Sequence, residues 1–136
     1  MNHQRIQNIS LLLIAISMAP VGLQAAFTPR SFFDDFPLGR GWIAKEGGAY
    51  DEHLVRDVGV LFLALVIVTA WTALRSRPAR PVAVAWLVQG VLHVWYHVGH
   101  LDGYGTADKV GMIGSLVVIP VLALVAVWAG GSKSTA

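Results

Sequence analysis

The run VGMIGSLVVIPVLALVAVWAG, from Val110 to Gly130, contains no charged side chain. A helix needs about 20 apolar residues to cross the hydrocarbon core of a bilayer. The run is long enough for this, and its one proline, Pro120, is expected to kink the helix rather than end it. The sequence therefore predicts a transmembrane helix here.

Three earlier apolar runs are of similar length. The predicted spans cover about residues 6–27, 54–74, 82–100 and 109–130, with an outer loop at 28–53. Short connections rich in proline or glycine separate the later spans, and these residues end helices. We expect a single integral membrane domain, 1–136, with an all-α fold. This fold is a four-helix transmembrane bundle with up-down connectivity.

The composition agrees with a membrane protein. Of the 136 residues, 55% are hydrophobic and only 13% are charged, about half the charged share of soluble domains. The chain has no cysteine, which excludes disulfides, thiolate metal sites and a cysteine nucleophile. A net charge of +2 without any nucleic-acid motif argues against nucleic acid as a partner. The expected partners are the lipid bilayer and other membrane-protein subunits.

The first apolar run also has features of a signal peptide, with Arg5 as its basic start. A signal peptide is expected to end in a small-x-small cleavage site. Leu23, Gln24 and Ala25 fit that pattern poorly. We therefore expect this run to be retained as a helix.

Basic residues predict the orientation of the bundle. Arg75, Arg77 and Arg80 lie between the second and third spans, Arg5 and Lys133 flank the two ends, and no acid accompanies these five. All acids fall on the opposite side: Asp34, Asp35, Glu46, Asp51, Glu52, Asp57, Asp102 and Asp108. The positive-inside rule places both termini in the cytoplasm, N-in/C-in. The expected location is the cell membrane, as a multi-pass protein of a bacterial inner membrane.

The outer loop 28–53 is the only sizeable predicted segment outside the membrane. Its aromatic and polar residues alternate without a clear period. One interpretation is a loop that lies on the headgroups or folds over the end of the bundle. The other is a lid over a site, with Asp34 and Asp35 reaching in.

Three of the five histidines fall in VLHVWYHVGHLDG, Val91–Gly103. On a helix, His93, His97 and His100 share an arc of about 60°. A polar stripe at this depth is expected to face protein or a wet cavity, since lipid offers it no partner. His53 and Asp57 are one turn apart at the outer end of the second span, and an Asp-to-imidazole hydrogen bond would raise the basicity of the ring. A polar pocket near the extracytoplasmic face is therefore expected.

Three main interpretations of this pocket are open, and a relay for protons or a small ligand is a further one. The first is a transition-metal site for zinc, copper or iron, because histidines at i and i+4 are a common ligand pair. Its candidate ligands are His93, His97, His100, His53 and Asp57. The second is haem b, held by His53 on one helix and by His93 or His97 on another. The third is a hydrogen-bonded polar network that fixes helix register.

Two short motifs are similar to sequences seen elsewhere: Arg56-Asp-Val-Gly59 at the start of one span, and His97-Val-Gly-His-Leu-Asp-Gly103 at the end of another. Both resemble small four-helix integral membrane proteins of high-GC actinobacteria, a group without an assigned activity. The resemblance covers most of the chain from Phe33 onward. It implies the architecture and no reaction.

Two classes of function follow from these patterns. In the first, the histidine-rich pocket is a metal or haem site for redox chemistry or for a lipophilic substrate. In the second, the protein is an accessory or scaffolding subunit of a larger membrane complex, with no chemistry of its own. The sequence leaves open whether the protein is an enzyme.

Overall fold

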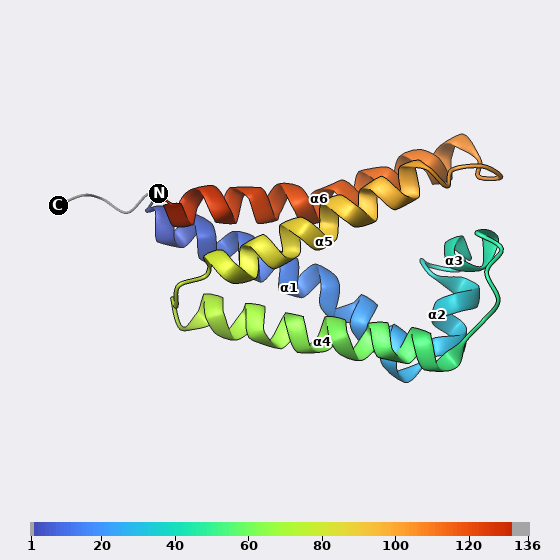
Figure 1. The fold of residues 1–136 in the computed structure, drawn as a ribbon, viewed down its shortest axis with the longest axis horizontal. Coiled ribbons are helices and arrows are strands. Elements are labelled where there is room, and N and C mark those ends of the chain that lie inside the picture. Colours follow the sequence, from blue (N-terminus) through green and yellow to red (C-terminus); the bar gives the residue numbers. More distant parts are fainter. Residues whose placement is uncertain (1, 132–136) are drawn as a thin grey trace. The chain divides into compact units, whose positions relative to one another are not determined.

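The structure is a computed structural model that describes residues 2–131. Lys133, one of the five basic residues that predict the orientation, lies outside the described residues. Within 2–131 the chain forms helices and no strand, which confirms the all-α prediction (Figure 1). The helices are α1 His3–Phe27, α2 Pro29–Asp35, α3 Trp42–Lys45, α4 Glu52–Leu74, α5 Arg80–Val98 and α6 Thr106–Gly131.

Among the described residues, three helices are long and apolar enough to cross a membrane: α1, α4 and α6. The sequence predicted four such helices. Helix α5 is not among the three, because Gln89, His93 and His97 lower its apolar character. Large apolar side chains are nevertheless exposed on several helices, for example Leu61 at 70% and Leu124 at 57%. Water solvates such surfaces poorly, whereas lipid chains solvate them well.

Two boundaries differ from the sequence prediction. The predicted outer loop 28–53 contains α2 and α3, and α4 already begins at Glu52. Helix α5 was expected to reach residue 100 but ends at Val98. Gly99 and His100 form a turn in which the backbone N–H of each donates to the carbonyl three residues before it. His100 is therefore not on the helix that carries His93 and His97.

The chain divides into two compact units. The first unit consists of 1–15 and 68–136, as far as these residues are described, and the second unit of 16–67. Helices α1 and α4 contribute one segment to each unit. Each unit has its own set of close contacts.

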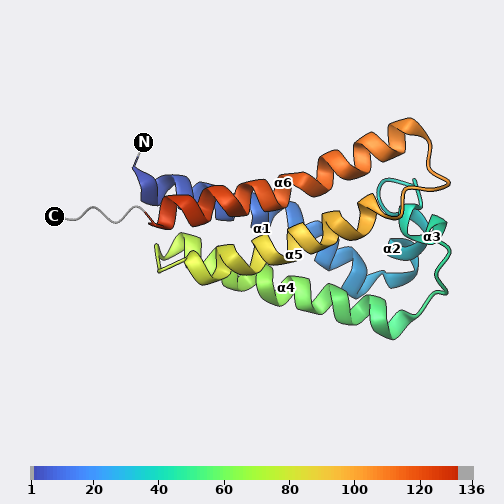
Figure 2. The same ribbon diagram turned by 45° about the horizontal axis from the view of Figure 1, so that its top comes forward.

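In the first unit, α5 and α6 run side by side (Figures 1 and 2). Their backbones approach closely because Gly90 has no side chain: a Cβ there would lie 2.7 Å from Cδ of Pro120. The indole Nε1 of Trp86 donates a hydrogen bond of 2.8 Å to Oγ1 of Thr69, and both residues are 0% exposed. The Gln7 side chain donates to the Ala126 carbonyl at 2.9 Å. These buried polar groups are thus satisfied within the unit, as burial requires.

In the second unit, α4 crosses the end of α1 at Gly59. A Cβ on Gly59 would lie 2.3 Å from the backbone N of Ala26, so only glycine fits there. The Arg56 guanidinium donates to the Ala26 carbonyl at 2.6 Å and to Glu52 at 2.8 Å. The crossing is therefore held by one charged hydrogen bond beside a close backbone contact.

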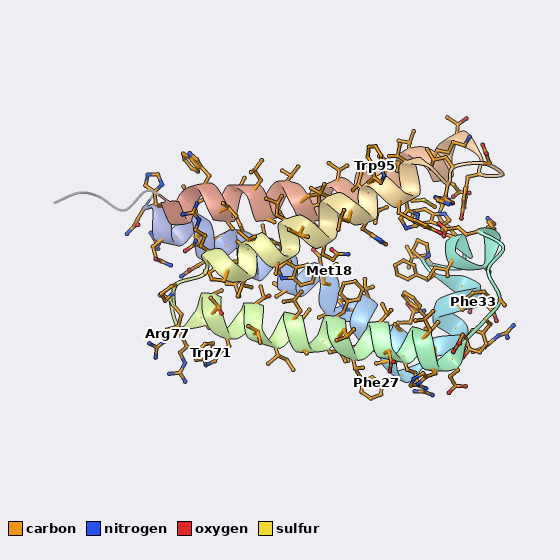
Figure 3. All side chains as sticks on the ribbon, in the orientation of Figure 1. Met18, Phe27, Phe33, Trp71, Arg77 and Trp95 are labelled. Carbon is orange, nitrogen blue, oxygen red and sulfur yellow. The ribbon has the colours of Figure 1, made fainter. Side chains whose placement is uncertain are left out.

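Helices α2 and α3 also belong to the second unit and pack on each other. The ring of Phe33, labelled in Figure 3, meets the ring of Tyr50 edge-on with centroids 5.3 Å apart. The Arg30 guanidinium lies 4.9 Å from the centroid of the same Tyr50 ring. Such aromatic and cation contacts order a segment whose sequence shows no helical period.

Candidate functional site

The end of α5 carries a pair of imidazoles. His93 and His97 are one helical turn apart, and their ring centroids lie 4.6 Å from each other with planes at 89°. This is the pairing expected from i, i+4 spacing. His93 is exposed and His97 is partly buried.

His100 lies just beyond the helix and has a defined hydrogen bond. Its Nδ1 is 2.7 Å from the backbone carbonyl of Tyr96. A carbonyl oxygen only accepts hydrogen bonds, so we assign the proton to Nδ1. In the neutral ring this leaves the lone pair on Nε2. A backbone carbonyl that fixes the tautomer in this way is a common support for a metal-binding histidine.

Tyr96 is the residue that the sequence analysis missed. Its ring stacks on His100, with centroids 4.1 Å apart and planes at 18°, and it meets the His97 ring edge-on at 5.3 Å. The sequence offered an indication of this contact, because Tyr96 and His100 are four residues apart, as are His93 and His97. Because α5 ends at Val98, His100 packs on Tyr96 instead of continuing the stripe.

His53 and Asp57 form a second pair, in the second unit. Nε2 of His53 lies 3.4 Å from Oδ2 of Asp57, and both side chains are exposed. This confirms the prediction that they share one face of a helix.

The two carboxylates proposed as parts of a lid have partners on their own helix. Asp34 accepts from Arg30 at 2.6 Å, and Asp35 accepts from Ser31 at 3.1 Å. Both bonds lie within α2 and help to hold its short run of turns together.

No group of three or more His, Asp or Glu side chains within residues 2–131 is arranged to hold a metal ion. The five-residue metal site, made of His93, His97, His100, His53 and Asp57, stays a prediction. So do haem b and the choice among zinc, copper and iron. The structure shows two separate pairs, His93 with His97 and His53 with Asp57.

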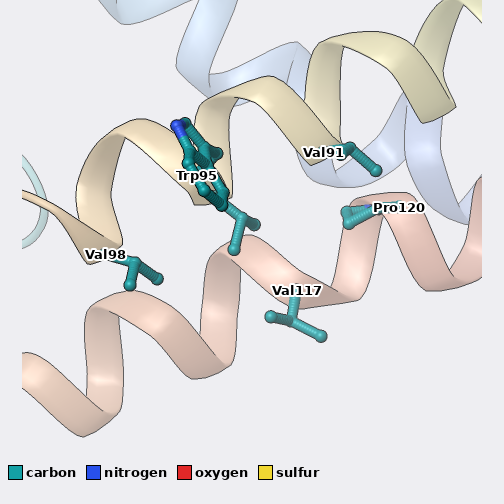
Figure 4. A pocket seen from close by; sticks show the side chains of 6 residues that line it. Val91, Trp95, Val98, Val117 and Pro120 are labelled. Carbon is teal, nitrogen blue, oxygen red and sulfur yellow. The ribbon is translucent and has the colours of Figure 1, made fainter.

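An apolar groove lies between α5 and α6, and neither His93 nor His97 lines it. Its volume is about 270 Å³, and Figure 4 shows the residues that line it: Val91, Val94, Trp95, Val98, Val117 and Pro120. Trp95 is 80% exposed. Every lining side chain is apolar except for the indole N–H, so the groove offers packing and almost no hydrogen bonding.

No family model, no curated protein and no solved structure matches this chain. The resemblance to small actinobacterial membrane proteins therefore stays a prediction that rests on its two short motifs.

Proposed function

We propose that the protein is a four-span membrane protein that binds a transition-metal ion through His93 and His97. The observation that carries this proposal is the pair of imidazoles one turn apart, with ring centroids at 4.6 Å. Two imidazoles on adjacent turns offer nitrogen ligands to one ion, and imidazole suits zinc, copper and iron. In this proposal the location is a bacterial inner membrane.

The fourth span is α5. Its 19 residues correspond to about 28 Å of helix, close to the thickness of the hydrocarbon core. Helix α6 is long and apolar enough to cross a membrane, and α5 packs alongside it. A helix that packs along a spanning helix lies at the same depth, so the two cross together. The short connections then give the order N-in/C-in, with the arginine-rich turn inside.

In this proposal, His100 and water supply the remaining ligands of the metal ion. The lone pair that we assign to Nε2 of His100 belongs to a ring oriented by the Tyr96 carbonyl. Water completes a site with only two or three protein ligands, which is the pattern of catalytic rather than structural zinc. The proposed role is a metal site open to a small or lipophilic reactant at the outer face.

The test is metal stoichiometry in detergent-purified protein. All forms carry His3→Gln, so that an imidazole beside the amino terminus does not contribute. After equilibrium dialysis against Zn²⁺, the parent is expected to hold one ion per chain and the His93→Gln/His97→Gln double variant none. Equal zinc in both forms would end the proposal. A His53→Gln form tests the predicted five-residue site, since loss of zinc there would add His53 to the ligands.

An accessory or scaffolding subunit is the second candidate. The observation that favours it is the apolar groove between α5 and α6, which is lined in part by the highly exposed Trp95. Grooves of this kind accept a side chain or helix of another membrane protein. This candidate predicts purified protein with no stoichiometric metal and no Soret band in its absorption spectrum.

A further inference from the structure

Four arginines lie at one end of the first unit. Arg75 and Arg77 follow the end of α4, Arg80 begins α5, and Arg5 lies in the first turns of α1. We call these four the arginine rim. Figures 1 and 2 show the start of α1 and the α4–α5 connection at the same end of this unit, and all four side chains of the rim are exposed.

The backbone of the connection is fixed by hydrogen bonds. Ser76 has φ 47°, and its N–H donates to the Ala73 carbonyl at 3.3 Å, while the Arg77 N–H donates to Thr72 at 3.1 Å. This pair of bonds is a Schellman motif, which ends a helix with a left-handed residue. The Asn8 side chain donates to Oγ of Ser76 at 3.0 Å and ties α1 to the turn. The rim is therefore held on an ordered turn.

Among the described residues, no carboxylate pairs with an arginine of the rim. The only acids in residues 1–15 and 68–136 are Asp102 and Asp108. Asp102 lies in the connection that follows the far end of α5, and Asp108 lies in the first turn of α6. Within residues 2–131, no ion pair joins an arginine of the rim to an acid. Arginines of the second unit differ, since Arg30 pairs with Asp34 and Arg56 with Glu52. Four positive charges at this end are left for an outside anion.

Tryptophans place the rim near the membrane surface. Trp71 is half exposed in the last turns of α4, and the Arg77 guanidinium lies 5.9 Å from the centroid of its ring; Figure 3 labels both residues. Trp128, near the end of α6, is also exposed. Indoles concentrate at the level of the lipid headgroups. The rim therefore lies where phosphodiester groups are dense.

We propose that the arginine rim binds an anionic phospholipid through its headgroup phosphates. Guanidinium groups bind phosphate oxygens in a bidentate manner. Three arginines within six residues suit a headgroup with two phosphodiesters, as in diphosphatidylglycerol, better than a single phosphate. The apolar surface above the rim, which includes the exposed Leu74, lies where the acyl chains of the same lipid run. The site is independent of the histidine pair.

The experiment measures lipid binding to the detergent-purified full chain by native mass spectrometry, with diphosphatidylglycerol and phosphatidylcholine as probes. The wild type is expected to bind diphosphatidylglycerol at least about tenfold more tightly. Each arginine near an anionic surface contributes a factor of roughly 5, so Arg75→Gln/Arg77→Gln/Arg80→Gln is expected to lose most of this preference. The matched control, Arg30→Gln/Arg40→Gln/Lys45→Gln, removes the same amount of charge from the second unit. This variant is expected to keep the preference for diphosphatidylglycerol.

A second variant guards against misfolding or altered orientation. Arg75→Lys/Arg77→Lys/Arg80→Lys keeps the charge but loses the bidentate geometry, and is expected to bind more weakly than wild type and more tightly than the glutamine form. Equal binding of both lipids by the wild type would overturn the proposal. So would an unchanged preference in the glutamine form. Full competition by millimolar inorganic phosphate would assign the site to a free anion instead of a lipid.

Discussion

Replacing Gly59 by alanine tests the helix crossing in the second unit. The added Cβ would lie 2.3 Å from N of Ala26, and 2.8 Å from both C of Ala25 and Cα of Ala26. Non-bonded heavy atoms prefer separations of about 3.5–4.0 Å. Since all three atoms belong to the backbone, no side-chain rotation relieves the contact. The two helix segments must therefore move apart by about 1 Å.

The free energy of unfolding is expected to fall by about 1–3 kcal/mol, which is the usual cost of overpacking. Alanine itself favours a helix over glycine by roughly 0.5–1 kcal/mol, which offsets part of this cost. Separation also stretches the hydrogen bond from Arg56 to the Ala26 carbonyl, now 2.6 Å. A charged hydrogen bond contributes about 1.5–3 kcal/mol where it is shielded, and less here because Arg56 is partly exposed.

The assay is unfolding in detergent, by heat or by titration with a denaturing detergent. Gly114→Ala in α6 is the matched control, because a Cβ there has no described neighbour within 4 Å, and it is expected to be neutral or stabilising. Adding Ala26→Gly to Gly59→Ala is not expected to restore stability, since the clashing atoms remain. If Gly59→Ala proves as stable as Gly114→Ala, the close crossing is wrong.

The first unit and the proposed metal site give three further predictions. Thr69→Val leaves the buried indole N–H of Trp86 without its acceptor, so unfolding experiments should show a loss of about 1–3 kcal/mol, whereas Thr69→Ser should retain most of the stability. Gly90→Ala should destabilise the α5–α6 contact by about 1–3 kcal/mol, and adding Pro120→Ala should recover part of it, because the nearest clashing atoms belong to the proline ring. Zinc binding at the end of α5 should weaken as the pH falls from about 7.5 to about 5.5, since protons compete with the metal for imidazole; dialysis at both pH values measures this.

The long helices could be predicted because their signal is local. A run without charge and long enough to span, such as 110–130, allows few alternatives. The pairs His93–His97 and His53–Asp57 followed from helical spacing alone, and both are observed. One-turn contacts need no knowledge of the rest of the fold.

Other features depend on information that spacing does not carry. Helices α2 and α3 are short and are held by aromatic contacts such as Phe33 with Tyr50. Their sequences therefore show no helical period of hydrophobic residues from which they could be predicted. His100 left the predicted stripe because α5 ends at Val98. The close contact of Gly59 with Ala26 is set by the register between two helices. The five candidate ligands come from α4, from α5 and from the turn after α5. Bringing them together also depends on the register between helices, which residue spacing within one helix does not determine.

The most direct test of the proposed metal site is X-ray absorption at the zinc edge of the loaded His3→Gln protein. The account predicts at least two imidazole nitrogens at about 2.0–2.1 Å from the zinc. His93→Gln/His97→Gln protein treated in the same way should show no imidazole scattering. A parent spectrum that matches hydrated zinc, with oxygen neighbours alone, would contradict the assignment of His93 and His97 as ligands.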